Sequence, residues 1–250
     1  AFANSGTIFI PDGTYLINGD TTNANGLSGG ILVLSNTHLI LSKNAILKRK
    51  ASSSPYGNIL RLQSVSNITI EGGTIDGNRS GFSDVSGTGE FNYNIGIWGG
   101  SNICISSIKL LNSYGDGLIF ERGQDNSTPT LINLSNVICD NNRRNGCSVI
   151  DINSFTFNGC EFSNTNGTAP QAGLDIEPGI VTRLVSNGTI TNCRFINNAV
   201  RGLDVQGLNG YIQSLIIDTC IAKGNLAAGG SFYQCSLPIS LSNSVSDTNN

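Results

Sequence analysis

Apolar and polar residues alternate along this chain in a short pattern that returns every 23 to 35 residues. Its nine copies begin at residues 8, 39, 68, 103, 132, 155, 188, 215 and 239. In each copy the first, third, sixth and eighth positions are mostly apolar and the others mostly polar, as in Ile68–Asn78 and Ile103–Ser113. Alternation predicts a half-buried strand, and the interruption after the third position predicts a bend between two strands.

A further short strand follows several of these copies, and it begins each time at a glycine. These strands are predicted at Gly117–Glu121, Gly146–Ile150, Gly173–Glu177 and Gly202–Gln206. Three short strands in each turn of variable length predict an all-β fold, a single-stranded parallel β-helix of about nine coils. We expect one such domain over residues 1–250, with like residues of successive coils about 4.8 Å apart.

Two residue types recur at fixed places in the pattern and support this alignment. Asparagine takes the tenth position at Asn112, Asn141, Asn164 and Asn197. A tight turn there would use the side-chain amides to satisfy backbone groups. Cysteine takes the sixth, inward position at Cys160, Cys193 and Cys220. We interpret these cysteines as small buried apolar residues, although adjacent coils would also lie close enough for one disulfide.

Composition removes several other classes of protein. Charged residues make up 12% of the 250 positions, glycine supplies 31 and methionine none, which disfavours coiled coils and helical bundles. The chain contains no run of 18 apolar residues, so the sequence predicts no membrane-spanning helix. A net charge of −3 with scattered charges does not favour binding to nucleic acid. The seven cysteines form no CxxC pair, and the chain has one histidine, His38. We therefore expect no metal site and no cofactor. Because the chain opens directly on an apolar run, we expect an internal piece of a longer protein without its N-terminal cap.

The segment Ile8–Tyr15 reads IFIPDGTY. It resembles the opening of the pectate-lyase-like superfamily of right-handed parallel β-helices. GLDIEP at Gly173–Pro178 and NGCSV at Asn145–Val149 resemble strands of bacteriophage tailspikes and related polysaccharide depolymerase domains. The resemblance implies a right-handed helix, a polysaccharide as partner, and a glycan hydrolase, lyase or epimerase. It also implies an extracellular or virion-surface location and a homotrimer.

Acidic residues gather on one outward face of the predicted helix. If Leu174 and Ile176 point inward, alternation turns their polar neighbours outward. The candidate catalytic residues on this face are Asp175, Glu177, Asp204 and Glu121. Asp175 and Asp204 should be direct neighbours, whose repulsion raises the pKa of one carboxyl. Asp175 and Glu177, two residues apart on one strand, should lie roughly 7 Å apart, which suits an inverting glycosidase. A pair of carboxyl groups about 5 Å apart on adjacent strands suits a retaining glycosidase. Backbone spacing does not decide between them.

Candidate substrate-binding residues lie on the same face or at the turns that border it: Trp98, Tyr114, Arg144 and Arg201. Trp98 has two interpretations, a platform that stacks on a sugar ring or a ring covered by the insertion at residues 78–93. The turn arginines, with Arg143, would bind acidic sugar carboxylates or remain solvated surface charges. The insertion holds Phe82, Asp84 and Glu90, and we expect it to form a groove wall or a subunit contact.

These residues favour a polysaccharide depolymerase that works by hydrolysis with paired carboxylates in an exposed groove. A polysaccharide lyase is the second enzymatic hypothesis, with Arg144, Arg201 or Tyr114 as the base. An epimerase is disfavoured because the Asp-Pro-His-Glu motif of the alginate type has no counterpart. The hypothesis of a different class is a non-catalytic shaft or glycan-binding adhesin, in which outward carboxylates only keep the surface soluble.

Overall fold

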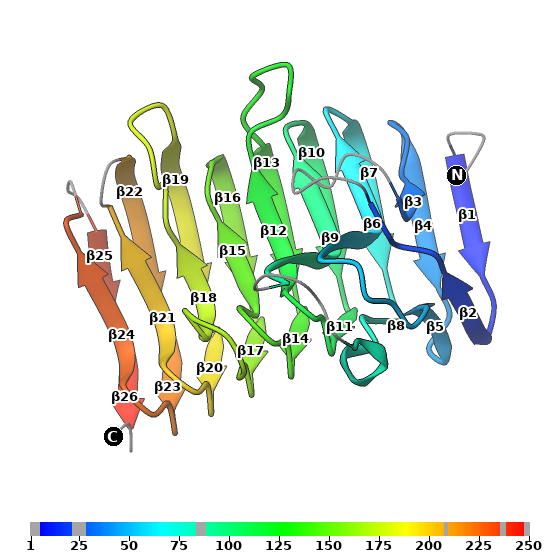
Figure 1. Cartoon of the computed structure of the whole chain (residues 1–250). Coiled ribbons are helices and arrows are strands. Elements are labelled where there is room, and N and C mark those ends of the chain that lie inside the picture. Colours follow the sequence, from blue (N-terminus) through cyan, green and yellow to red (C-terminus); the bar gives the residue numbers. More distant parts are fainter. Residues whose placement is uncertain (1–5, 22–28, 84–88, 208–209, 236–238, 248–250) are drawn as a thin grey trace.

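The computed structural model describes residues 6–21, 29–83, 89–207, 210–235 and 239–247. Three parallel sheets run the length of the molecule, and the chain passes through each sheet once per coil, from the N-terminal end to the C-terminal end (Figure 1). A single short 3₁₀ helix, η1 (Arg79–Gly81), is present among the described residues. The architecture is the nine-coil parallel β-helix that the repeat predicts.

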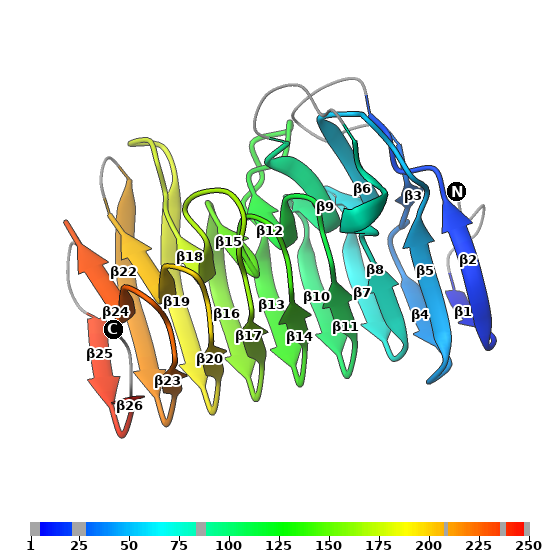
Figure 2. The same cartoon turned by 60° about the horizontal axis from the view of Figure 1, so that its bottom comes forward.

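Among the described residues, sheets A and B collect one strand from each of the nine coils and sheet C one from each of the first eight, so strand order follows the coils (Figure 2). Sheet A contains β1 (Gly6–Ile10), β4 (Thr37–Leu41), β7 (Ser66–Glu71), β10 (Ser101–Ser106), β13 (Thr130–Ser135), β16 (Ile152–Asn158), β19 (Leu184–Thr191), β22 (Tyr211–Asp218) and β25 (Ile239–Ser242). Sheet B contains β2 (Gly13–Ile17), β5 (Ala45–Arg49), β8 (Thr74–Asp76), β11 (Lys109–Leu111), β14 (Ile138–Asp140), β17 (Glu161–Ser163), β20 (Arg194–Ile196), β23 (Ile221–Lys223) and β26 (Val245–Asp247). Sheet C contains β3 (Ile31–Leu32), β6 (Tyr56–Gln63), β9 (Phe91–Trp98), β12 (Asp116–Glu121), β15 (Cys147–Val149), β18 (Ala172–Ile176), β21 (Arg201–Gln206) and β24 (Ala228–Tyr233).

The predicted alignment of the coils is confirmed from the third copy onward. In sheet A the first residues of the later copies are paired in order: Ile68, Ile103, Ile132, Phe155, Gly188, Leu215 and Ile239. The first two copies were aligned wrongly by two residues, because Thr37 pairs with Ile68 and Gly6 with Thr37. A shift of two keeps every side chain on the same face, so hydrophobic alternation does not detect it.

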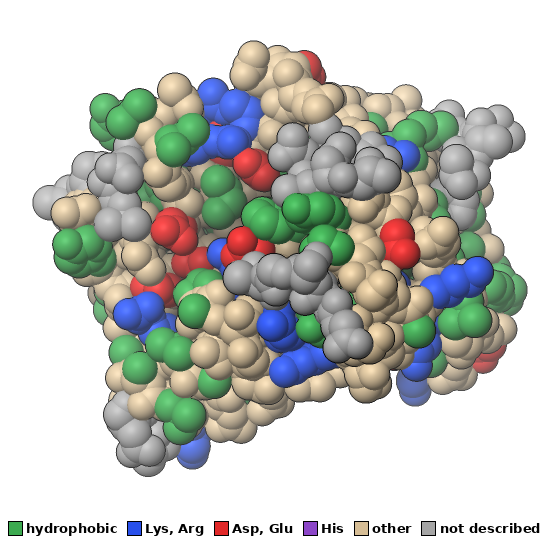
Figure 3. All heavy atoms as spheres, viewed as in Figure 1, with side chains coloured by type: hydrophobic (Ala, Val, Ile, Leu, Met, Phe, Trp, Pro, Cys, Tyr) green, Lys and Arg blue, Asp and Glu red, His purple; other side chains and the backbone are tan. Residues whose placement is uncertain are grey.

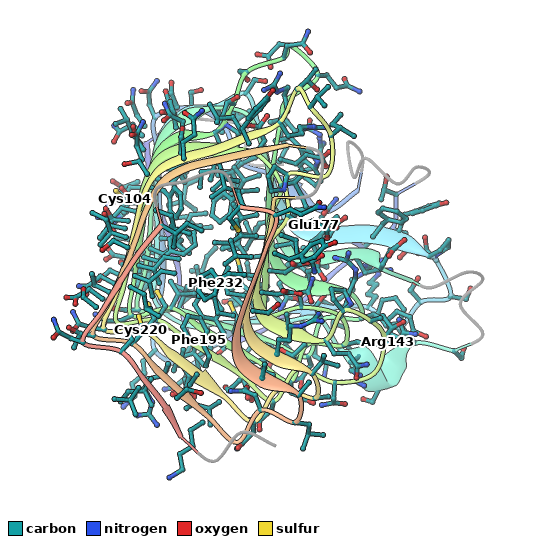
Figure 4. All side chains as sticks on the ribbon, turned by 90° about the vertical axis from the view of Figure 1, so that its left-hand side faces the viewer. Cys104, Arg143, Glu177, Phe195, Cys220 and Phe232 are labelled. Carbon is teal, nitrogen blue, oxygen red and sulfur yellow. The ribbon has the colours of Figure 1, made fainter. Side chains whose placement is uncertain are left out.

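The interior between the three sheets is filled by apolar side chains from every coil. Phe162 and Phe195, from adjacent coils, stack with their ring centroids 5.7 Å apart. Figure 4 shows Phe195 and Cys220 among the side chains between the sheets. Cys160, Cys193 and Cys220 are buried in this interior, as predicted, and all seven cysteines, each within the described ranges, are free thiols. Leu174 and Ile176 also belong to the core, which fixes the outward direction of their neighbours on β18.

The turns from sheet B to sheet C use asparagine in two ways. Asn112 and Asn141 adopt left-handed backbone angles, φ 54° and 53°, but their side chains bond along the stack, Asn141 Nδ2 donating to Asn112 Oδ1 at 2.8 Å. The hydrogen bonds to backbone groups of the turn come instead from the side chain of the residue after Asn141. Asn142, 0% exposed, accepts from the Ser113 amide at 2.8 Å and donates to the Leu110 carbonyl at 3.2 Å. The sequence-based assignment of that role to the tenth position was therefore wrong by one residue.

Candidate functional site

Four carboxyl groups meet on the outer face of sheet C and form what we call the acidic cluster: Asp116, Asp175, Glu177 and Asp204. Asp175 and Asp204 are paired residues of the adjacent strands β18 and β21, as the sequence predicts. Ser148 of β15 takes the same place on the other side of Asp175. Acidic side chains are visible over these strands of sheet C in Figure 3. Alternation along the strands places Asp175, Glu177 and Asp204 outside the apolar interior. Asp116 joins them through its contacts with Ser148 and Arg144.

The acidic cluster is enclosed, which corrects the expectation of an exposed groove for these carboxylates. Asp116, Asp175 and Asp204 are each 0% exposed, and only Glu177, directly after β18, is half-buried. The enclosure comes from polar side chains that bond to the aspartates. Asn145 Nδ2 donates to Asp175 Oδ2 at 3.0 Å.

Two arginines that the sequence offered as substrate ligands are bound to the chain's own carboxylates. Arg144 Nη1 lies 2.9 Å from Asp116 Oδ2, and Arg201 Nη1 lies 2.8 Å from Asp204 Oδ2. Asp204 Oδ2 also accepts from Gln206 Nε2 at 2.7 Å. Each guanidinium thus offsets part of the cost of burying a carboxylate next to others. Sequence reasoning did not foresee these two pairs. Arg144 reaches Asp116 of another coil from a turn, and Arg201 lies three residues before Asp204 on β21, a spacing that simple alternation would put on opposite faces.

Burial and mutual repulsion change the proton affinity of the acidic cluster. Desolvation, followed by the nearby charge of Glu177, raises the pKa of Asp175 to about 8, against the opposing effect of Arg144. Desolvation also raises the pKa of Glu177 and of Asp116. Asp175 is therefore mostly protonated at neutral pH.

The hydrogen bonds of Asp175 indicate which oxygen carries the proton. Oδ2 accepts from the Asn145 amide, as a carbonyl oxygen of a neutral acid does. Within the described ranges Oδ1 has no hydrogen-bond partner, although it is buried. A buried polar atom without a partner costs stability, so Oδ1 of the protonated acid retains an unused capacity to donate a hydrogen bond.

Glu121 lies on the same outer face but in a separate ion pair. It belongs to β12 and bonds through Oε1 to Arg183 Nη2 at 2.8 Å. Its strand neighbour in β9 is Trp98. The structure thus brings Asp175, Glu177 and Asp204 together and holds Glu121 toward another partner.

Of the two interpretations of Trp98, the covered ring is the one found. Trp98 is 3% exposed and packs edge-on against Tyr93, with ring centroids 5.9 Å apart, and beside Ile119. The ring folds back over Gly96, where an added Cβ would lie 2.2 Å from a ring carbon. A sugar therefore has no open face of this indole on which to stack.

Tyr114 lies between two other side chains. Its ring stacks on Phe82 with centroids 4.5 Å apart, and the Arg143 guanidinium lies 4.5 Å above the same ring. The insertion at residues 78–93 therefore does contact the borders of sheet C. Glu90, from its C-terminal part, reaches Arg144 Nε at 3.4 Å. Asp84 lies outside the described residues.

Membrane-spanning helices and metal-binding groups are both absent from the part of the chain that the structure describes. No helix there is both long and apolar enough to cross a membrane. No group of three or more His, Cys, Asp or Glu side chains there is placed to hold a metal ion.

Comparison with known proteins agrees with this geometry. The family model described as "Right handed beta helix region" matches residues 93–250. The chain belongs to this right-handed β-helix family. A curated relative, the uncharacterized protein YclG of Bacillus subtilis strain 168, is 30% identical over 82% of the chain. The chain spans only 38% of the length of YclG.

Two solved structures share the fold of this β-helix chain at low sequence identity. The A-module of the mannuronan C-5 epimerase AlgE4 from Azotobacter vinelandii aligns with a TM-score of 0.62 at 15% identity, over 96% of this chain and 68% of that one. The tailspike gp49 of the Acinetobacter baumannii bacteriophage Fri1, a capsular polysaccharide depolymerase, aligns with a TM-score of 0.62 at 15% identity, over 97% of this chain and 51% of the tailspike.

Proposed function

We propose that the acidic cluster hydrolyses glycosidic bonds of a polysaccharide, with Asp175 as proton donor and Glu177 as its partner carboxylate. The observation that carries this proposal is the burial of Asp175 directly beside Glu177, which raises the pKa of the Asp175 carboxyl to about 8. Glycoside hydrolysis requires one carboxyl that is still protonated at working pH and one that is ionised. A surface that used carboxylates only for solubility would leave them in water at their usual pKa.

Each group has a definite task in this reaction. Because Asp175 is 0% exposed, the reaction requires the side chains that enclose it to move apart when the substrate binds. Asp175 Oδ1 then gives its proton to the glycosidic oxygen as the bond to the anomeric carbon breaks. Glu177, half-buried, either takes a proton from the attacking water or bonds to the anomeric carbon itself. Asp204 stays ion-paired to Arg201 and adds negative charge that keeps Asp175 protonated. Asn145 fixes the orientation of the Asp175 carboxyl through Oδ2.

A polysaccharide substrate is supported by the fold neighbours. The tailspike gp49 is a capsular polysaccharide depolymerase, and AlgE4 is a mannuronan epimerase. Both align over nearly the whole of this chain. They support the class of substrate, while the choice of hydrolysis comes from the carboxyl groups of this chain.

The side chains offered for a lyase are poorly suited to act as bases here. Although burial opposes the charged form, the carboxylates of Asp116 and Asp175 raise the pKa of Arg144 above its usual value. A guanidinium that binds its proton more tightly than usual does not accept another hydrogen from a sugar carbon. Arg201 is paired with Asp204, and Tyr114 lies between Phe82 and Arg143.

The test is incubation of the chain with a panel of capsular and exopolysaccharides while two signals are followed. New reducing ends without absorbance from unsaturated uronate are expected for hydrolysis. Both signals together would contradict hydrolysis and indicate β-elimination. Neither signal on any polysaccharide of the panel would favour a non-catalytic shaft.

A further inference from the structure

A second polar cavity lies beside the acidic cluster, at the turns that lead from sheet B to sheet C. It has a volume of about 550 Å³. Its charged lining consists of Lys48, Asp76, Arg79 and Arg143, and Tyr114 and Asn166 also face it. We call this cavity the arginine pocket. Lys and Arg side chains are visible below the acidic ones in Figure 3, and Arg143 lies on the same outer side of sheet C as Glu177 in Figure 4.

Among the described residues that line the arginine pocket, cations outnumber carboxylates. Three cations face one carboxylate there, and that carboxylate, Asp76, lies 3.6 Å from Lys48 Nζ. Arg79 forms no ion pair within the described residues. Its guanidinium donates instead to the amide oxygens of Asn166 at 3.1 Å and Asn141 at 3.5 Å. A pocket with an excess of oriented guanidinium groups attracts an anion.

The two arginine side chains converge at one place. An added Cβ at Gly167 would lie 2.7 Å from Arg79 Nη2 and 2.8 Å from Arg143 Cγ, so both side chains approach the same glycine. Burial and the positive charge of Arg143 lower the pKa of Arg79. An anion placed between the two guanidiniums would relieve this repulsion. The ring of Tyr114, beneath Arg143, adds an apolar surface beside the charges.

The arginine pocket is one residue away from the acidic cluster along the chain. Arg143 faces the pocket while Arg144 turns to Asp116. Backbone hydrogen bonds from the Arg143 amide to Ser113 and from the Arg144 amide to Gly115, at 3.0 and 2.9 Å, hold the turn in place.

We propose that the arginine pocket binds an anionic substituent of a glycan, a carboxylate, phosphate or sulfate group, between the guanidiniums of Arg79 and Arg143. The pocket thereby selects acidic polymers and fixes their position relative to Asp175. That the anion is carried by a glycan rests on the proposed function; that the pocket binds an oxyanion does not.

The test is titration calorimetry of the chain with D-glucuronate, inorganic phosphate and inorganic sulfate, each at low ionic strength. At least one of the three should bind saturably, and its relative affinity identifies the substituent. Arg79→Gln should weaken binding about tenfold, because one charge-assisted contact is lost. Arg143→Gln should do the same and serves as a second variant if Arg79→Gln does not fold. Arg194→Gln is the matched control, because Arg194 is 60% exposed and pairs with Glu161 on sheet B.

Two outcomes would overturn the anion site: no saturable binding of any of the three anions, or equal affinity in the folded Arg79→Gln and Arg194→Gln proteins. Failure of the proposed hydrolysis is distinguishable from both, since Asp175→Asn should abolish cleavage and leave anion binding within about twofold. Binding that survives when no polysaccharide is cleaved would retain the anion site and reject the enzyme.

Discussion

Asp175 and Asp204 are paired residues of adjacent strands β18 and β21, and both carboxyl side chains are excluded from water. Arg201 neutralises Asp204 through a contact of 2.8 Å. Within the described residues, no cation lies at hydrogen-bond distance from Asp175. Its carboxyl accepts one hydrogen bond, from Asn145 Nδ2 at 3.0 Å. The two aspartates therefore differ in environment although they share one position of the repeat, and this difference is why the proposed reaction uses Asp175 as the acid.

The unfolding free energy should fall as the pH rises from about 5 to about 8. Asp175 has a pKa of about 8 in the folded chain and close to 3.8 when unfolded, so the folded state holds more protons in this range. The raised pKa values of Glu177 and Asp116 act in the same direction. Denaturant unfolding at several pH values measures the slope.

Asp175→Asn should remove most of this pH dependence, because the amide stays neutral at every pH. The Asn variant is expected to be at least as stable as the native chain at pH 8 and to gain little at pH 5. Glu161→Gln, at an ion pair on sheet B, is the control and should keep the slope. An Asp175→Asn protein with an unchanged slope would show that the Asp175 carboxyl titrates normally.

The fluorescence of Trp98, the single tryptophan, should be that of a buried indole and resist quenching by iodide. Gly96→Ala should shift the emission to longer wavelength and lower stability by about 1–3 kcal/mol, because the new Cβ overlaps the ring. Gly179→Ala is the matched control, since a Cβ there meets nothing within 4 Å. Equal spectra for the two variants would be inconsistent with the packing of Trp98 over Gly96.

Asn142→Ala should destabilise the chain by about 2 kcal/mol or more. The substitution leaves the buried Ser113 amide and Leu110 carbonyl without their side-chain partner. Asn133→Ala, at an exposed position of β13, should change the unfolding free energy by less than about 0.5 kcal/mol. Chemical denaturation compares the two, and a cost that is the same for both would mean that Asn142 does not support the turn.

The sequence predicted the coils and the pairing of Asp175 with Asp204 because both follow from a local alternation that repeats. It did not predict the alignment of Thr37, since a shift of two residues preserves the pattern. It did not predict the burial of Asp175, and it left both interpretations of Trp98 open, the covered ring and the sugar platform. The burial of Asp175 depends on Asn145 of a neighbouring coil and that of Trp98 on Tyr93 of the same strand, and no periodicity encodes the directions of these side chains. The arginine pocket joins Arg79 of one coil to Arg143 of another and was missed for the same reason.

Cleavage rates of single-residue variants on a polysaccharide that the native chain degrades test the account most directly. Asp175→Asn and Glu177→Gln should each reduce the release of reducing ends at least about 100-fold, the usual scale of a lost acid or base. The native rate should decline as the pH rises above about 8, where Asp175 loses its proton. Glu161→Gln should keep the native rate. Full activity of the folded Asp175→Asn protein would contradict the assignment of Asp175 as the proton donor.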